Sequence, residues 1–183
     1  MAVPDPGWAQ DLLDFWFDEL NDSDWFKPGP AVDLAIKERF EPTLTAFAEA
    51  EPGEFLTDSD TTRAAILLFD QLPRNLYRES ARAFAYDDKA LFLAKEAIAR
   101  GWDRQLPDRE RQFVAMPLMH SEDLADQDAS VAYFGKHLPD NLSFAHSHRQ
   151  MIARFGRFPH RNAALGRETT DAEQAAIDEG FSW

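Results

Sequence analysis

Ser59–Asn75 reads SDTTRAAILLFDQLPRN, and this stretch decides the fold. Its first four residues carry side-chain oxygens that can cap the start of a helix. The run that follows, Ala64 to Leu68, is apolar at every position, which predicts a helix buried on most sides. Leu72 precedes Pro73, and the residue before a proline is disfavoured in the α region. We therefore expect this helix to end by Leu72, with Asp70, Arg74 and Asn75 in a polar exit.

A second segment, Phe155–Asn162, reads FGRFPHRN and resembles the exit of that helix. Both segments have Phe, two residues, Leu or Phe, Pro, one or two basic residues and Asn, and the second has one extra residue. Two similar helix exits predict an internally repeated helical layout. If the two loops lie side by side, their polar side chains face one cavity.

The rest of the chain shows helical periodicity, and no window alternates as a strand flanked by turns does. We expect a kink or break at Pro42, an interruption at Pro117, and an N-cap at Ser121. A capping box at Thr170–Glu173 opens a short last helix. The aromatic side chains, Phe26 among them, are expected in the core. The sequence predicts an all-α fold of about eight helices in a single domain, residues 1–183.

Composition and charge restrict the classes of function. The 183 residues include no cysteine, which excludes disulfides and thiolate chemistry. Residues 1–7 have no basic region followed by an apolar run, and no apolar window is long enough for a membrane span. The net charge is -14, and residues 1–60 hold 15 acidic against 3 basic side chains. Such a charge repels nucleic acid and anionic membranes, so we expect a cytoplasmic protein that binds no membrane, and RNA binding through the arginines is disfavoured.

One segment inverts this charge. Five arginines and no acidic residue lie between Arg149 and Arg167. Guanidinium groups suit carboxylate or phosphate ligands because their donors form a rigid planar fork. The alternative is that these arginines bind helix carbonyls and neighbouring acids.

Three polar groups stand at helix ends or proline-marked bends. They comprise Asp70, Gln71, Arg74 and Asn75; His120, Ser121, Glu122, Asp123 and Gln127; and His148, Arg157, His160, Arg161, Asn162 and Arg167.

The same groups permit several kinds of chemistry. His120, Glu122 and Asp123 beside another histidine have poor spacing for a metal, and nearby arginines repel cations, so we expect no metal and no cofactor. Arginines favour a neutral imidazole at His148 or His160, which suits acid–base chemistry. The alternative reading makes Glu122 and Asp123 the caps of a helix start. No serine-nucleophile turn and no phosphate-binding glycine loop is present.

The chain resembles the bacterial domain of unknown function 924 family. The motifs that carry the resemblance are Phe15-Trp16-Phe17, Trp25-Phe26, Phe69–Asn75, Met116–Asp123, and Phe155–Asn162 with Leu165-Gly166-Arg167. The resemblance implies a tetratricopeptide-like, all-helical fold and no particular activity. Leu72 stands where the family pattern has Phe. His148 matches a family position and His146 does not.

Together these observations predict one pocket on a concave helical face for a small anionic ligand. Turnover of that ligand, hydrolysis included, stays open, as do the ligand's identity and the oligomeric state. In this hypothesis Arg157 and Arg161 hold the anion, His148 or His160 moves a proton, and Glu122 or Asp123 orients a histidine or water. The alternative is a non-enzymatic scaffold that binds a peptide or protein along its helices.

Overall fold

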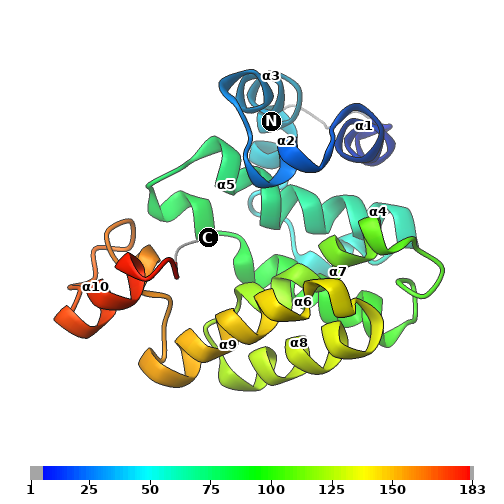
Figure 1. Cartoon of the computed structure of the whole chain (residues 1–183). Coiled ribbons are helices and arrows are strands. Elements are labelled where there is room, and N and C mark those ends of the chain that lie inside the picture. Colours follow the sequence, from blue (N-terminus) through cyan, green and yellow to red (C-terminus); the bar gives the residue numbers. More distant parts are fainter. Residues whose placement is uncertain (1–5, 182–183) are drawn as a thin grey trace.

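The computed structural model describes residues 6–181, and these residues fold into α-helices and short helical turns without a strand (Figure 1). The prediction of an all-α fold is confirmed. The interpretation of residues 1–7 as lacking a secretory signal falls mostly on Met1–Asp5, outside the described range. The helices are α1 (Trp8–Asp14), α2 (Asp22–Phe26), α3 (Pro30–Ala46), α4 (Ser59–Ile66), α5 (Leu72–Leu76), α6 (Asp87–Ala99), α7 (Asp108–His120), α8 (Leu124–His137), α9 (Leu142–Phe155) and α10 (Asp171–Asp178). Shorter π-helical turns span Phe15–Glu19 and Leu67–Gln71, and 3-10 turns span Pro52–Phe55, Ala81–Phe84, Pro139–Asn141 and Pro159–Arg161.

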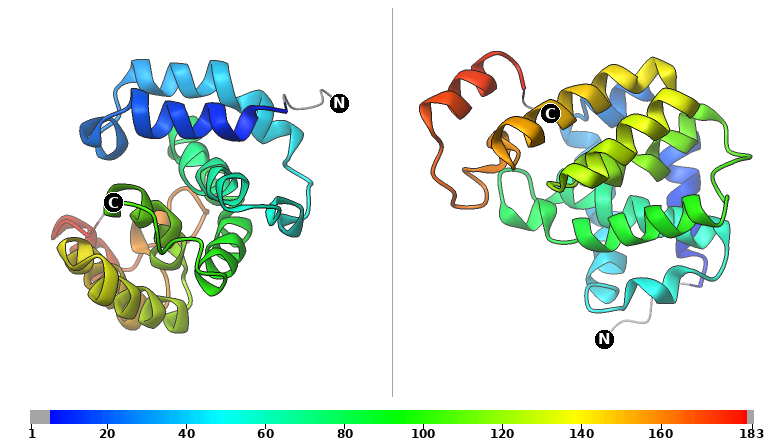
Figure 2. Two further views of the ribbon diagram at one scale, coloured as in Figure 1. Left: turned by 90° about the vertical axis from the view of Figure 1, so that its right-hand side faces the viewer. Right: turned by 90° about the horizontal axis from the view of Figure 1, so that it is seen from below.

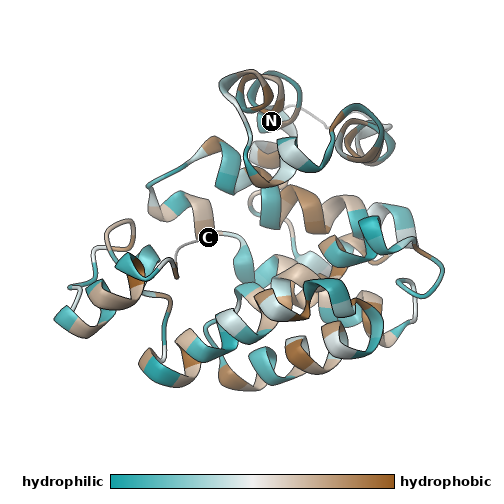
Figure 3. Cartoon of the chain, viewed as in Figure 1, coloured by the Kyte–Doolittle hydropathy of each residue, from teal (hydrophilic) through white to brown (hydrophobic). Residues whose placement is uncertain are grey.

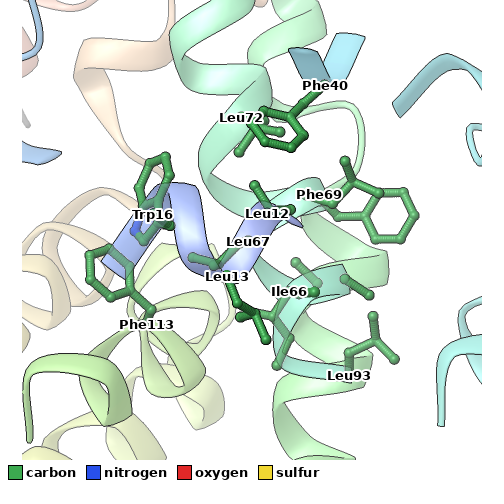
Figure 4. Close-up of a cluster of buried hydrophobic side chains, with 14 of the residues drawn as sticks. Leu12, Leu13, Trp16, Phe40, Ile66, Leu67, Phe69, Leu72, Leu93 and Phe113 are labelled. Atoms are coloured by element: carbon green, nitrogen blue, oxygen red, sulfur yellow. The ribbon is translucent and has the colours of Figure 1, made fainter. Parts of the chain in front are cut away.

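The centre of the molecule is α4 with the π-helical turn that follows it. Every residue from Ala64 to Asp70 is at most 1% exposed, as the apolar run predicted. Leu12 of α1 and Leu93 of α6 belong to the same hydrophobic cluster (Figure 4). Figure 3 shows hydrophobic residues along this central segment, whereas the outer helices carry hydrophilic residues as well.

The prediction that the helix ends by Leu72 is wrong. Leu72 is itself helical, with φ −61° and ψ −41°, and α5 continues directly from the π-helical turn. The wide turn bonds the Leu72 N–H to the carbonyl of Leu67, five residues back. Pro73, which has no N–H, lies in the first turn of α5, directly after this wide turn. The two similar motifs therefore differ in backbone, since the second one does end a helix.

Two other prolines also lie inside helices. Pro42 lies within α3, so that helix is not split, and Pro117 lies within α7. The prediction of an interruption at Pro117 is wrong. Buried side chains on both sides of it, including Phe113 and Leu118, pack into the core and outweigh the lost hydrogen bond. Phe26, expected in the core, is 57% exposed at the end of α2.

The remaining helices arrange around this centre in chain order. Helix α1 packs on α4 and α3 on α5, at the end of the molecule opposite α8 and α9 (Figures 1 and 2). Helices α6, α7, α8 and α9 each pack on the next. Helix α9 ends at Gly156, which adopts a left-handed conformation with φ 68°. The chain then turns through Pro159–Arg161, against which α10 packs.

Candidate functional site

Asp70 and His120 form the centre of the polar cluster. Asp70 lies in the π-helical turn and is fully buried, and His120 is the last residue of α7. Their Oδ1 and Nδ1 atoms are 2.7 Å apart. The other Asp70 oxygen, Oδ2, accepts a hydrogen bond from Gln71 at 2.5 Å. The π-helical turn thus places a carboxylate in the protein interior with both oxygens engaged.

The protonation of this pair follows from its surroundings. Burial alone would raise the pKa of Asp70, but the charges of His120 and Arg74 and the hydrogen bonds hold that pKa well below its usual range. An ionised carboxylate only accepts hydrogen bonds, so Nδ1 of His120 carries the proton. Nε2 therefore has the lone pair when the ring is neutral. The His120 side chain is 16% exposed.

Asp87 connects the two similar proline-containing segments, Phe69–Asn75 and Phe155–Asn162. It accepts from Arg74 at 2.9 and 3.0 Å and from Arg161 at 3.2 Å. Arg161 also donates to the backbone oxygen of His120 at 3.0 Å. The two motifs therefore do meet in space, through a carboxylate at the start of α6. Asp87 is not among the predicted site residues, because no local sequence pattern shows a contact between distant segments.

Arg161 is a buried cation with spare hydrogen-bonding capacity. The residue is 6% exposed, and its guanidinium lies 4.5 and 4.6 Å from the ring centroids of Phe84 and Phe158. Within residues 6–181 its buried Nε–H has no acceptor. Burial and the charge of Arg74 lower its pKa to about 10, despite nearby carboxylates. Burial and the charge of Arg74 thus outweigh the effect of the carboxylates around this guanidinium.

Two further imidazoles lie close to His120. The rings of His120 and His148 are 6.3 Å apart, and Phe158 lies 5.5 Å from His148 and 5.7 Å from His160. Nδ1 of His148 donates to the backbone oxygen of Phe144 at 2.8 Å. Burial, and to a smaller extent the charge of His120, lowers the pKa of His148 to about 3. Burial, and to a smaller extent the charge of Arg161, lowers the pKa of His160 to about 4. Both rings are therefore neutral near pH 7.

Glu122 and Arg167 hold the arginine-rich segment in place. Arg167 binds both oxygens of Glu122, at 2.8 and 3.0 Å, and donates to the backbone oxygen of Phe158 at 3.1 Å. Glu122 accepts the Phe158 N–H at 2.7 Å. This closed set of contacts ties the segment after α9 to the segment after α7. Glu122 contacts Arg167 and Phe158, whereas the carboxylate that contacts a histidine is that of Asp70.

Four predicted site residues have other partners. Arg157 donates to both oxygens of Glu173 on α10, at 2.6 and 3.0 Å, so it does not face His120 as an anion holder. Asn75 donates to Asp33. Asn162 is fully buried and donates to Thr169 at 3.3 Å. Asp123 is the N-cap of α8, accepting from Ala125 and Asp126.

The N-cap of α8 corrects one prediction and supports another. Ser121, predicted as the cap, instead accepts from the Asp123 N–H and donates to Asp126. Asp123 caps because its carboxylate reaches two backbone N–H groups of the first turn. The alternative reading of Asp123 as a helix cap is thus the observed one.

Metal ligands do not cluster here. Across residues 6–181 there is no group of three or more His, Asp or Glu side chains arranged to hold a metal ion. A separate hollow of about 290 Å³, lined by Asp103, Tyr133 and His137 among others, contains no residue of the predicted site. No described helix has both the length and the apolar composition that a membrane crossing requires.

The fold and the motifs around Asp70 and His120 define a bacterial family. The family described as "Bacterial protein of unknown function (DUF924)" matches residues 12–180, and the chain belongs to it. A solved structure of a protein of unknown function from Agrobacterium tumefaciens is 38% identical. That similarity covers 94% of this chain and 97% of the other, with a TM-score of 0.87. No curated protein matches the chain.

Proposed function

We propose that the chain binds a small anionic molecule beside His120, with Arg161 as the principal cationic group. The observation that carries the proposal is the Nε–H of Arg161, a buried donor without an acceptor among residues 6–181. Most buried polar groups in proteins have a hydrogen-bond partner. A carboxylate or phosphate oxygen would supply that partner.

The surroundings of Arg161 support the same proposal. Asp87 and the His120 backbone already fix the guanidinium, so little conformational entropy would be lost on binding. Phe84 and Phe158 cover it on apolar faces. The low pKa values of His148 and His160 leave both rings uncharged near pH 7. The anion would therefore be attracted by Arg161 and not by either histidine. Arg157, by contrast, is bound to Glu173 and is not part of this proposal.

A thermal-shift screen tests the proposal, with inorganic phosphate, sulfate and a series of dicarboxylates as probes. A ligand at a hundred times its Kd stabilises the folded state by about 2.7 kcal/mol. For a domain of this size that corresponds to roughly 5 to 10 °C. We expect at least one anion to raise the melting temperature of the wild-type protein.

Two lysine variants make the screen specific. Arg161→Lys keeps the charge but loses Nε–H and the planar fork, so the stabilisation is expected to disappear. Arg157→Lys is the matched control, since Arg157 is also an arginine of the segment but is engaged by Glu173. Equal stabilisation of the two variants would contradict the proposal.

The second candidate is a tetratricopeptide-like scaffold that binds a peptide or protein. The observation that favours it is the consecutive packing of α6 to α9, with Phe144 52% and Leu124 42% exposed on the last two helices. Peptides selected against the protein would then bind less well to Phe144→Ser and equally well to Arg161→Lys. Weaker peptide binding to Arg161→Lys, with unchanged binding to Phe144→Ser, would place the peptide at the arginine-rich segment instead. For either function we propose a cytoplasmic location, which cell fractionation tests.

A further inference from the structure

We infer that Asp70 and His120 form a general-base pair in which Nε2 of His120 activates water to hydrolyse a carboxylic ester that carries a separate carboxylate. The inference rests on the proposed anion site at Arg161, which would hold the carboxylate of the substrate. His120 is the catalytic residue in this account, and Asp70 is a positioning residue.

The geometry of Asp70 suits positioning. Its Oδ1 lies 2.7 Å from His120 Nδ1 and 3.3 Å from the Arg74 guanidinium, and Oδ2 accepts from Gln71. A fully buried carboxylate with these three neighbours has no freedom to rotate, so it fixes the plane and the tautomer of the imidazole. The carboxylate owes its place to a π-helical turn, a distortion that is often found at functional sites.

The tautomer decides which nitrogen can react. Nδ1–H points to Asp70, so Nε2 presents its lone pair. All interactions of His120 within residues 6–181 leave Nε2 without a hydrogen-bond partner, and the side chain is partly exposed. A water molecule or hydroxyl group can therefore donate to Nε2, which is the geometry that general-base catalysis requires.

The charged and titratable groups around His120 single it out as the base. Burial keeps His148 and His160 neutral far below pH 7, and such weakly basic rings are poor proton acceptors. His120 differs because the Asp70 carboxylate contacts its Nδ1–H, which leaves Nε2 as the proton acceptor. The charged and titratable groups that interact with His120 are Asp70, His148, His160 and Arg161, which donates to the His120 backbone oxygen.

The charge balance indicates the class of anion. The acids and guanidinium groups of the cluster occur in equal number: Asp70, Asp87 and Glu122 against Arg74, Arg161 and Arg167. A dianionic phosphate would leave the buried site with two excess negative charges, whereas a carboxylate leaves one. Because excess charge in a poorly solvated site is costly, the cluster favours a monoanion.

The proposed step balances without a co-reactant. Water gives one proton to Nε2 as its oxygen forms a bond to the acyl carbon, and the electron pair of the C=O double bond moves to the carbonyl oxygen. The tetrahedral intermediate then re-forms the double bond and breaks the bond to the leaving oxygen. That oxygen takes the proton from Nε2–H. Ester and water become acid and alcohol, and His120 returns to its starting state.

Two chromogenic esters of equal chain length test the inference. Mono-4-nitrophenyl adipate carries a carboxylate, and 4-nitrophenyl hexanoate is its neutral counterpart. We expect the wild-type protein to hydrolyse the adipate above the buffer rate and faster than the hexanoate. His120→Gln should lower the adipate rate by about 100-fold or more, the usual contribution of a general base. Hydrolysis that is absent, or that persists in His120→Gln, would overturn the inference.

Separate measurements test the positioning role of Asp70. Asp70→Asn should lower kcat at least tenfold with little change in KM, because substrate contacts remain while the imidazole loses its positioning. Should that variant fail to fold, the tautomer of His120 can be read in the wild-type protein from long-range nitrogen–proton NMR correlations. Protonation at Nδ1 with a bare Nε2 is the expected result, and the opposite tautomer overturns the inference.

Arg161→Lys separates this inference from the anion site. We expect it to abolish the preference for the adipate, so that the ratio of the adipate rate to the hexanoate rate falls to about one. Equal rates on both esters in the wild-type protein, still dependent on His120, would overturn the anion site but not the general base. A saturable preference for binding adipate without His120-dependent hydrolysis would overturn the general base but not the anion site.

Discussion

At the scale of single residues, Asp70 is a carboxylate that the fold removes from water. It is fully buried, yet its contacts with His120, Arg74 and Gln71 keep it ionised. Sequence reasoning could place Asp70 in a polar group near a proline. It could not predict the burial, because that depends on a π-helical turn that no simple spacing rule indicates.

Replacement of Asp70 by asparagine is expected to lower the free energy of unfolding by about 3 kcal/mol. The amide removes the charge that compensates Arg74 in the interior, and breaking a buried pair typically costs this much. Asp88→Asn is the matched control, since Asp88 is exposed in the first turn of α6, and its effect should stay within about 0.5 kcal/mol. Urea denaturation measures both. Equal effects of the two substitutions would show that Asp70 is not held as described.

His148 makes stability depend on pH. Its folded pKa, about 3, lies below the unfolded value of about 6.5, so the unfolded chain binds a proton first as the pH falls. This contribution to stability is fully present above pH 6.5 and is lost as the pH falls towards 3. Between pH 7 and 5 the loss amounts to about 2 kcal/mol. Groups facing His148 are His120, His160, Arg161 and the Phe144 carbonyl.

The measurement is the free energy of unfolding at pH 7 and pH 5. His148→Asn keeps a donor for the Phe144 carbonyl but does not titrate, so the difference between the two pH values should shrink. His146→Asn, on the exposed face of the same helix, should leave it unchanged. A pH dependence that is the same in both variants would refute this origin.

At the scale of elements, the arrangement of the two proline motifs was only partly predictable. Both were read as helix exits, and only the segment at Gly156 is one. Residue types alone cannot distinguish a proline that starts a new helical segment from one that follows a helix end. The difference lies in the backbone before the proline, a π-helical turn in one case and a left-handed glycine in the other.

A prediction at the scale of elements concerns Gly156, which follows the last residue of α9. Its positive φ favours glycine, and an added Cβ would meet nothing within 4 Å, so strain in the backbone is the whole cost of a substitution. Gly156→Ala should destabilise the fold by about 1 kcal/mol. Gly53→Ala is the control, with equal space and no positive φ, and should be neutral or slightly stabilising. Thermal denaturation of the pair checks this, and a neutral Gly156→Ala would contradict it.

At the scale of the whole molecule, composition and periodicity sufficed for the all-α class, the buried central helix and several helix bounds. The side chains chosen from the sequence as site residues have different partners in the structure, for a physical reason. Arg157 and Arg161 look alike in sequence, but Arg157 meets Glu173 whereas Arg161 meets Asp87 and two aromatic rings. Partners are set by packing between distant segments, which a single sequence does not reveal.

The most direct test of the anion site is an NMR titration of the arginine Nε–H signals with adipate. We expect the Arg161 signal to shift saturably, because the carboxylate accepts the hydrogen bond that residues 6–181 leave unmade. The Arg157 signal should stay in place, since Glu173 already occupies that donor. An Arg161 signal that does not move, or that moves no more than that of Arg157, would contradict the proposed site.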